Sequence, residues 1–146
     1  MVRRVLLNLE APDYIMAELT KEYPSLTFTA VKRDSPQLYN YLKDTEVFLS
    51  FQCKKEILAK APQLRFIQLL RVGMDGAPLK EIFDRGITLA NAKGIHNHIM
   101  SEYAIGAMIN LSRNWHLVYK NQLQGKWDRG VPQGEIRGAT LGILGL

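Results

Sequence analysis

Five short segments in the first part of the chain have the hydrophobic pattern of β-strands. Most are continuous apolar runs, which are typical of parallel strands buried on both faces, and one alternates between apolar and polar positions. Helical spacing and proline or glycine boundaries predict helices between these segments. The expected strands are residues 5–9, 26–31, 46–50, 65–70 and 87–90, and the expected helices are residues 12–22, 36–43, 54–61 and 78–85.

Regular alternation of strands and helices predicts βαβ units, and therefore a parallel sheet with helices on both faces. Right-handed crossovers leave few possible topologies for such a sheet. We therefore expect residues 1–98 to form an α/β domain, a flavodoxin-like doubly wound parallel sheet.

The pattern changes after Asn91, where a polar loop leads into a stretch with apolar residues at helical spacing. These positions predict one long helix over residues 99–123, longer than a small sheet needs as cover. Glycines and a proline then predict an irregular arm over residues 125–138. A helix that extends past its own sheet is expected to contact another domain or another subunit.

The last residues of the chain combine an apolar run with glycines. Residues 140–144 are expected to form a strand, and Gly145 could begin the glycine-rich phosphate loop that follows the first strand of a Rossmann domain. The sequence stops one residue later, so we expect a truncated cofactor site. An ordinary C-terminal strand remains the alternative.

Composition and charge are those of a globular protein, with 47% hydrophobic and 23% charged residues. The net charge of +5 comes from scattered basic pairs without interleaved aromatic residues, which favours a solvated surface over nucleic-acid binding. The single cysteine, Cys53, fits a reducing compartment, so a cytoplasmic location is expected. No membrane span or signal peptide is expected.

Four motifs in sequence order resemble the N-terminal portion of the NAD-dependent D-isomer-specific 2-hydroxyacid dehydrogenases, the phosphoglycerate dehydrogenase-like group. They are residues 64–67 with 71–75, residues 86–91 with 94–96, residues 101–113, and residues 122–145. The resemblance implies a substrate domain over residues 1–98. It also implies that residues 99–146 begin an NAD-binding domain with a long helix, a dimerisation arm and a first Rossmann strand.

The resemblance also implies roles for individual residues. The backbone of Val72 and Gly73 would bind the substrate carboxylate, with Ser50, Phe51 and His96 as further substrate-binding candidates. A plain turn, a surface loop and a helix-capping histidine are the respective structural alternatives. Met100 would pack on the nicotinamide, or be an ordinary core residue, and Gly145 would contact the cofactor.

The leading hypothesis is the N-terminal part of an oxidoreductase that moves a hydride between NAD(H), or NADP(H), and a 2-hydroxy or 2-keto acid. The resemblance places the catalytic arginine, glutamate and histidine later in the chain, so no catalytic residue is expected here. These 146 residues alone should be inactive and should form a homodimer. The alternative is a non-enzymatic, flavodoxin-like dimerising or binding module. Response-regulator signalling is disfavoured because no aspartate pair follows the first strand.

Overall fold

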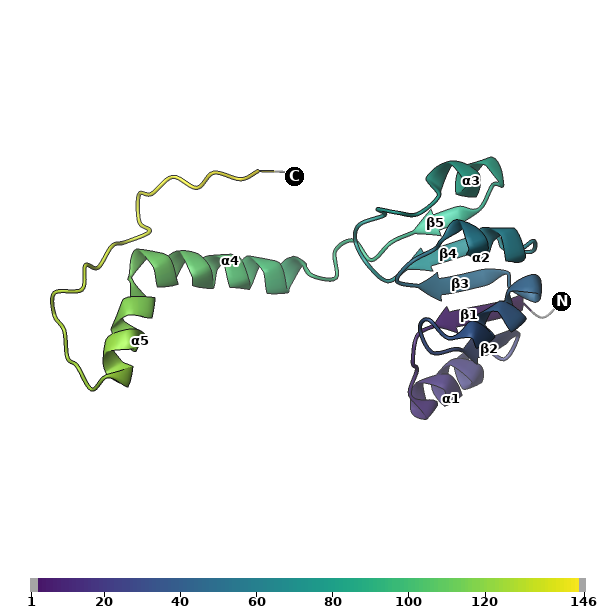
Figure 1. The fold of residues 1–146 in the computed structure, drawn as a ribbon, viewed down its shortest axis with the longest axis horizontal. Coiled ribbons are helices and arrows are strands. Elements are labelled where there is room, and N and C mark those ends of the chain that lie inside the picture. Colours follow the sequence, from purple (N-terminus) through teal and green to yellow (C-terminus); the bar gives the residue numbers. More distant parts are fainter. Residues whose placement is uncertain (1–2, 145–146) are drawn as a thin grey trace. The chain divides into compact units, whose positions relative to one another are not determined.

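The computed structural model describes residues 3–144, which divide after Gly94 into two compact units. Each unit is shown in Figure 1. The first contains β1 (Arg3–Asn8), α1 (Asp13–Glu22), β2 (Leu26–Ala30), the 3-10 helices η1 (Pro36–Asn40) and η2 (Leu42–Asp44), β3 (Val47–Ser50), α2 (Lys55–Lys60), β4 (Phe66–Leu69), α3 (Leu79–Asp84) and β5 (Thr88–Ala90). The second contains α4 (Asn97–Ser112) and α5 (Trp115–Leu123).

The five strands form one parallel sheet in the order β2-β1-β3-β4-β5. All five expected strands and the doubly wound α/β class are therefore confirmed. The crossover from β1 to β2 runs in the opposite direction from those through β3, β4 and β5. Because such crossovers are right-handed, α1 lies on one face of the sheet and α2 and α3 lie on the other.

The main core lies on the α2 and α3 face. Leu6, Phe48 and Ile67 are register partners on neighbouring strands, and each is at most 1% exposed. Ile57 of α2 and Ile82 of α3 pack in the same cluster. Burial of these large side chains is the dominant favourable contribution to folding.

The opposite face is less completely covered. On this face Val5, Val47 and Phe66 are register partners on neighbouring strands. Val5 is buried, whereas Val47 and Phe66 are only half-buried. Helix α1 contacts β2 at the sheet edge and does not extend over β3 and β4 in the same way. The apolar strands predict that helices cover both faces of the sheet. The structure has complete helical cover on the α2 and α3 face and partial cover on the α1 face.

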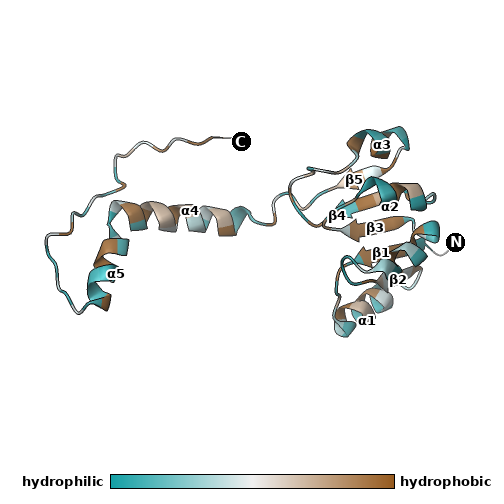
Figure 2. Cartoon of the chain, viewed as in Figure 1, coloured by the Kyte–Doolittle hydropathy of each residue, from teal (hydrophilic) through white to brown (hydrophobic). Residues whose placement is uncertain are grey.

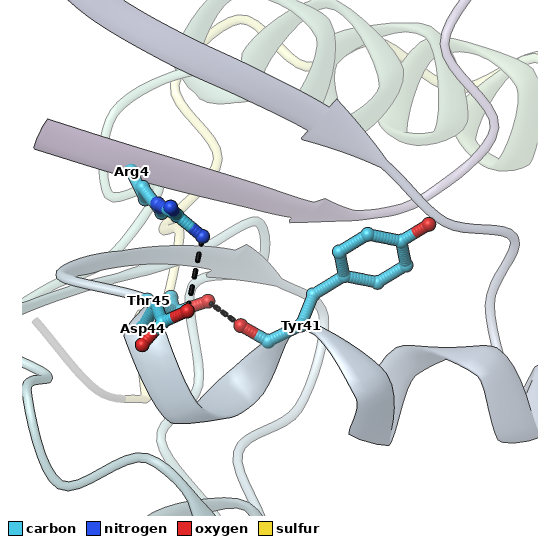
Figure 3. A network of polar contacts seen from close by, with 4 residues as sticks. All are labelled: Arg4, Tyr41, Asp44 and Thr45. Atoms are coloured by element: carbon cyan, nitrogen blue, oxygen red, sulfur yellow. Dashed lines mark hydrogen bonds and ion pairs between the residues drawn. The ribbon is translucent and has the colours of Figure 1, made fainter. Parts of the chain in front are cut away.

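Two polar arrangements fix the connecting segments of the first unit. Arg4 of β1 pairs with Asp44 of η2 at 3.0 Å, and the Thr45 hydroxyl donates to the Tyr41 carbonyl at 2.7 Å (Figure 3). Arg85, after α3, donates to the carbonyls of Leu58 and Ala61 at 2.6 Å each. The last carbonyl groups of a helix have no N–H partner within that helix. The Arg85 guanidinium supplies donors to such carbonyls at the end of α2.

The second unit corrects the expectation of one long helix over residues 99–123. Helix α4 ends at Ser112, and Asn114 takes a left-handed conformation with φ of 50°. The Asn114 side-chain amide donates to the Pro132 carbonyl at 2.9 Å, and the Gly134 amide donates to the Ser112 carbonyl at 2.8 Å. The arm thus binds the end of α4 and stabilises a break that apolar periodicity does not reveal.

Gly134 allows this close approach, because an added Cβ would lie 2.8 Å from the Ser112 carbonyl oxygen. The arm itself is irregular, as its glycines predict. The expected strand over residues 140–144 is wrong: these residues form no regular structure. A strand needs a neighbour to pair its backbone groups, and the described part of the chain offers residues 140–144 none.

Figure 2 shows hydrophobic residues along α4, and none of that helix is buried. Tyr103 and Leu111 are 74% and 68% exposed. No helix within residues 3–144 has both the length and the apolar character that a membrane crossing requires.

Candidate functional site

The candidate substrate site lies where β3, β4 and β5 end in the first unit. The Leu70 amide donates to the Ser50 carbonyl at 2.9 Å, which joins the end of β3 to the segment after β4. The Ala92 amide donates to the Arg71 carbonyl at 3.1 Å, which joins that segment to the end of β5. Ligands of parallel α/β sheets bind at this carboxyl edge, so the segment after β4 occupies a favourable position.

The turn after β4 presents backbone amides to solvent. Val72 is 44% exposed, Gly73 is also exposed, and the N–H group of neither forms a hydrogen bond to another residue within 3–144. A Cβ added at Gly73 would lie 2.7 Å from the Asp75 carboxylate oxygen. Two free amides beside a residue without a side chain can receive the oxygens of a carboxylate, which forms charge-assisted hydrogen bonds with such donors.

Side chains on both sides hold this turn. The Asn91 amide donates to the Val72 carbonyl at 2.8 Å and accepts from the Lys93 amide at 3.2 Å. The Arg71 guanidinium donates to the Asp75 carbonyl, while its buried Nε has no partner among the described residues. Asn91, which follows β5, and Arg71, which belongs to the turn itself, therefore both hold the turn in place.

Ser50 and Phe51, the candidates after β3, differ in accessibility. Ser50 is 2% exposed, and its hydroxyl accepts from the Asn8 side-chain amide at 3.1 Å and from the Gln52 backbone at 3.2 Å. Phe51 is exposed, and the Arg33 guanidinium lies 5.5 Å from its ring centroid. In this loop the Phe51 side chain is thus open to a ligand, whereas the Ser50 hydroxyl supports the local backbone.

His96 and Met100 belong to the second unit. The Met100 amide donates to the His96 carbonyl at 2.8 Å in the first turn of α4, and Met100 is 62% exposed. Their predicted contacts with substrate and nicotinamide stay predictions. Gly145, the expected cofactor glycine, lies outside the described residues.

Sequence reasoning assigned no site role to Asn91 or Asn8. Asn8 is the last residue of β1 and Asn91 directly follows β5, and a polar residue at the carboxyl end of a parallel strand is a recognisable signal. Their partners are far away in sequence, since Asn91 binds Val72 and Asn8 binds Ser50. Pattern analysis alone could flag these residues but not pair them.

Cys53 contributes no reactive group to the edge. Its thiol is 1% exposed, and burial raises its pKa to about 11, with a smaller opposing effect from the Arg85 charge. A protonated, buried thiol is a poor nucleophile. Residues 3–144 also contain no cluster of three metal-ligating side chains.

Comparison with known proteins identifies the family of the chain. Residues 5–142 match the family described as D-isomer specific 2-hydroxyacid dehydrogenase, catalytic domain. The chain belongs to this 2-hydroxyacid dehydrogenase family. The resemblance based on the four motifs is therefore confirmed.

Individual relatives in the 2-hydroxyacid dehydrogenase family are distant. D-3-phosphoglycerate dehydrogenase from Methanocaldococcus jannaschii is 28% identical over 114 residues, which cover 75% of this chain and 22% of that enzyme. D-lactate dehydrogenase from Aquifex aeolicus, solved with NAD and lactic acid, has a TM-score of 0.71 at 17% identity. A glyoxylate/hydroxypyruvate reductase from Sinorhizobium meliloti, solved with NADP and malonate, has a TM-score of 0.64 at 18% identity.

The structural matches show a shared fold. They cover 92% of this chain but only 41% of the Aquifex aeolicus protein and 42% of the Sinorhizobium meliloti protein. The chain thus spans well under half the length of these proteins, and about a fifth of the Methanocaldococcus jannaschii enzyme.

Proposed function

We propose that this chain supplies the substrate-binding part of a dehydrogenase that transfers a hydride between a nicotinamide cofactor and a 2-hydroxy or 2-keto acid. Within it, residues 1–98 would form the substrate domain and residues 99–146 the beginning of the cofactor domain. The observation that carries the proposal is the pair of backbone amides at Val72 and Gly73, which have no hydrogen-bond partner among residues 3–144 and lie at the carboxyl edge of a sheet from this family.

The proposed role of these amides is to bind and orient the acid. One carboxylate oxygen would accept from the Val72 N–H and the other from the Gly73 N–H. Fixing the carboxylate orients the neighbouring C2 atom, and positioning of this kind lowers the entropic part of a barrier. The cofactor, when bound, accepts or supplies the hydride at that carbon.

The proposal is tested by titrating the isotopically labelled protein with glyoxylate and recording amide chemical shifts. We expect the Val72 and Gly73 resonances to move in a saturable manner. Hydroxyacetone, which keeps a ketone and lacks the carboxylate, is the matched control and should leave them in place. Equal responses to both compounds, or no response to either, would refute the carboxylate site and favour a non-enzymatic module.

We propose NAD as the cofactor, with NADP as the alternative. The Aquifex aeolicus and Sinorhizobium meliloti structures contain NAD and NADP respectively, which supports a nicotinamide cofactor and not a choice between them. Met100 fits such a ligand, because its exposed thioether on α4 can pack on a flat ring. Met100 and Gly145 are the only cofactor contacts proposed among these 146 residues, so NADH titration of these residues alone should show no tight binding.

We also propose that the second unit forms a homodimer. Trp115 and Trp127 are 52% and 86% exposed, and the apolar side chains of α4 are exposed as well. Burying such surface contributes roughly 25 cal/mol per Å² toward the cost of association. Light scattering should give twice the monomer mass at micromolar concentration, and Trp115→Glu should lower it. A monomer mass that persists on concentration would refute the dimer.

A further inference from the structure

Strand β2 forms an open edge of the sheet. It pairs with β1 on one side and has no neighbouring strand on the other among the described residues (Figure 1). Natural sheets protect their edges with very short strands, charged residues or proline. The opposite edge strand, β5, has three residues, whereas β2 has five, Leu26–Ala30, with neither a charged residue nor proline. Strand β2 therefore lacks the usual protection against pairing with another strand.

The backbone hydrogen-bonding groups of β2 divide between its two edges. The Val31 amide donates to the Leu7 carbonyl at 2.8 Å, which fixes the direction of every second residue toward β1. In a strand, the N–H and C=O groups of neighbouring residues point to opposite sides. Because Leu7 is in register with Ala30, the N–H and C=O groups of Phe28 and Ala30 point away from β1, as does the Leu26 carbonyl. No other residue within 3–144 bonds to these outward groups.

The space beside this edge is open on the face of the sheet that carries the main core. Thr27 and Thr29 lie on that face, since they are the register partners of Arg4 and Leu6. A cavity of about 370 Å³ there is lined by Thr27, Thr29 and Tyr41, and Tyr41 is 47% exposed. No residue of α2 or α3 lines this cavity. A further strand can therefore approach β2 from the side without displacing a helix from this face.

The edge of β2 is complementary to a second copy of itself. In an antiparallel pair centred on Phe28, the Phe28 N–H of each copy donates to the Phe28 carbonyl of the other. The Ala30 N–H of each copy donates to the Leu26 carbonyl of the other, so every outward N–H finds an acceptor. Thr27 of one copy lies opposite Thr29 of the other, and opposing threonines and aromatic rings stabilise antiparallel strands. Use of the same groups by both copies is what a two-fold dimer requires.

We propose that β2 is a self-association surface, through which two copies of the first unit pair as antiparallel strands and form one continuous sheet. This interface is independent of the proposed dehydrogenase function and of the proposed contact through the second unit. Because the strands run in opposite directions across the junction, the carboxyl edges of the two sheets face opposite ways, and both Val72–Gly73 turns stay open. A strand pair buries little surface, so the two copies dissociate readily.

Engineered cysteines test the register of the pair. Thr27→Cys combined with Thr29→Cys places a thiol opposite a thiol, with Cα atoms about 4.5 Å apart, which a disulfide can span. In each single variant the thiol lies opposite a threonine, and the equivalent thiol of the other copy is roughly 8 Å away, beyond the reach of a disulfide. With oxidised glutathione, the double variant should form a covalent dimer at least about tenfold faster than either single variant.

The cysteine variants are made in the Trp115→Glu protein, which removes the proposed contact through the second unit. The full chain of 146 residues is used, and its own Cys53 is 1% exposed, so that thiol does not take part. Equal cross-linking rates in the double and single variants would refute the antiparallel β2 pair. Loss of the second-unit dimer would leave the cross-linking result unchanged, so the failures of the two proposals are distinguishable.

Ala30→Pro tests the outward backbone groups, and Ala30→Val, which keeps the N–H, is the matched control. Proline at this position leaves the bonds to β1 in place, because its missing N–H faces away from the ladder. In the double-cysteine protein, Ala30→Val should cross-link at the parent rate. Ala30→Pro should cross-link about tenfold more slowly, since the pair loses a hydrogen bond in each direction. Thermal unfolding of the same samples establishes that both variants are folded, and equal rates in the two would overturn the proposal.

Discussion

Asn91 should control the carboxylate-binding turn without contacting the ligand. Its side chain connects the end of β5 to Val72 through a 2.8 Å hydrogen bond, and accepts from the Lys93 amide at 3.2 Å. Asn91→Ala removes both bonds and leaves the Val72 carbonyl without its donor. We expect the turn to sample orientations in which the Val72 and Gly73 amides no longer converge on a carboxylate.

The expected magnitude follows from these two contacts. A hydrogen bond contributes about 0.5–1.5 kcal/mol to stability, and both bonds lie near the surface, where the lower part of that range applies. Loss of about 1 kcal/mol from the binding-competent turn corresponds to an approximately fivefold weaker affinity for glyoxylate. Urea unfolding should show a loss of stability of similar size.

Asn91→Asp is the matched variant. It keeps the acceptor for Lys93 but replaces the donor to Val72 with a carboxylate that faces a carbonyl. Glyoxylate titration, followed through the Gly73 amide, should therefore show weakened binding in both variants. If Asn91→Asp bound glyoxylate with the parent affinity, the contact to Val72 would not orient the turn. If both variants lost only stability, Asn91 would be purely structural.

Three further outcomes are expected. Phe48→Ala removes a fully buried ring and should cost about 3–5 kcal/mol in urea unfolding, while the exposed Phe51→Ala should cost under about 1 kcal/mol; equal losses would contradict the assigned core. Asn114→Gly should retain more helix on heating than Asn114→Ala, with a difference in stability of roughly 1 kcal/mol. Alanine is normally preferred over glycine within a helix, and only a left-handed backbone at residue 114 reverses that preference. A more stable alanine variant would therefore mean that α4 and α5 are continuous. Burial raises the pKa of Cys53 from its ordinary value of 9.0 to about 11, so the thiol ionises in the unfolded state at a lower pH than in the folded protein. Stability should therefore fall from pH 9 to 11 relative to Cys53→Ala. Parallel pH profiles of the two proteins in urea unfolding would refute the raised pKa.

The sequence predicted those parts of the fold that depend on local pattern. Each strand is a short apolar or alternating run, so its position followed from burial alone. Residues 99–123 were predicted as one helix because apolar spacing continues past Asn114, whose left-handed conformation depends on contact with the distant Pro132. Residues 140–144 have strand-like composition, but a strand forms only where a neighbour can pair with it.

The candidate site divides in the same way. Val72 and Gly73 could be placed at a strand end because a β-to-α turn in a parallel sheet must lie at its carboxyl edge. The supporting contacts could not be predicted, because Asn91 reaches Val72 and Asn8 reaches Ser50 only once β1, β3, β4 and β5 are assembled. Local sequence determines where a polar side chain starts, and strand order determines what it meets.

The burial of Cys53 gives the protein an internal reporter of its own breathing motions. The thiol is the single one in the chain and lies in the core beside the start of α2. An alkylating reagent can reach it only when this segment opens, so the labelling rate in native buffer measures the opening equilibrium. Slower labelling in the presence of a ligand would report, without any engineered probe, that the ligand stabilises the sheet edge next to α2.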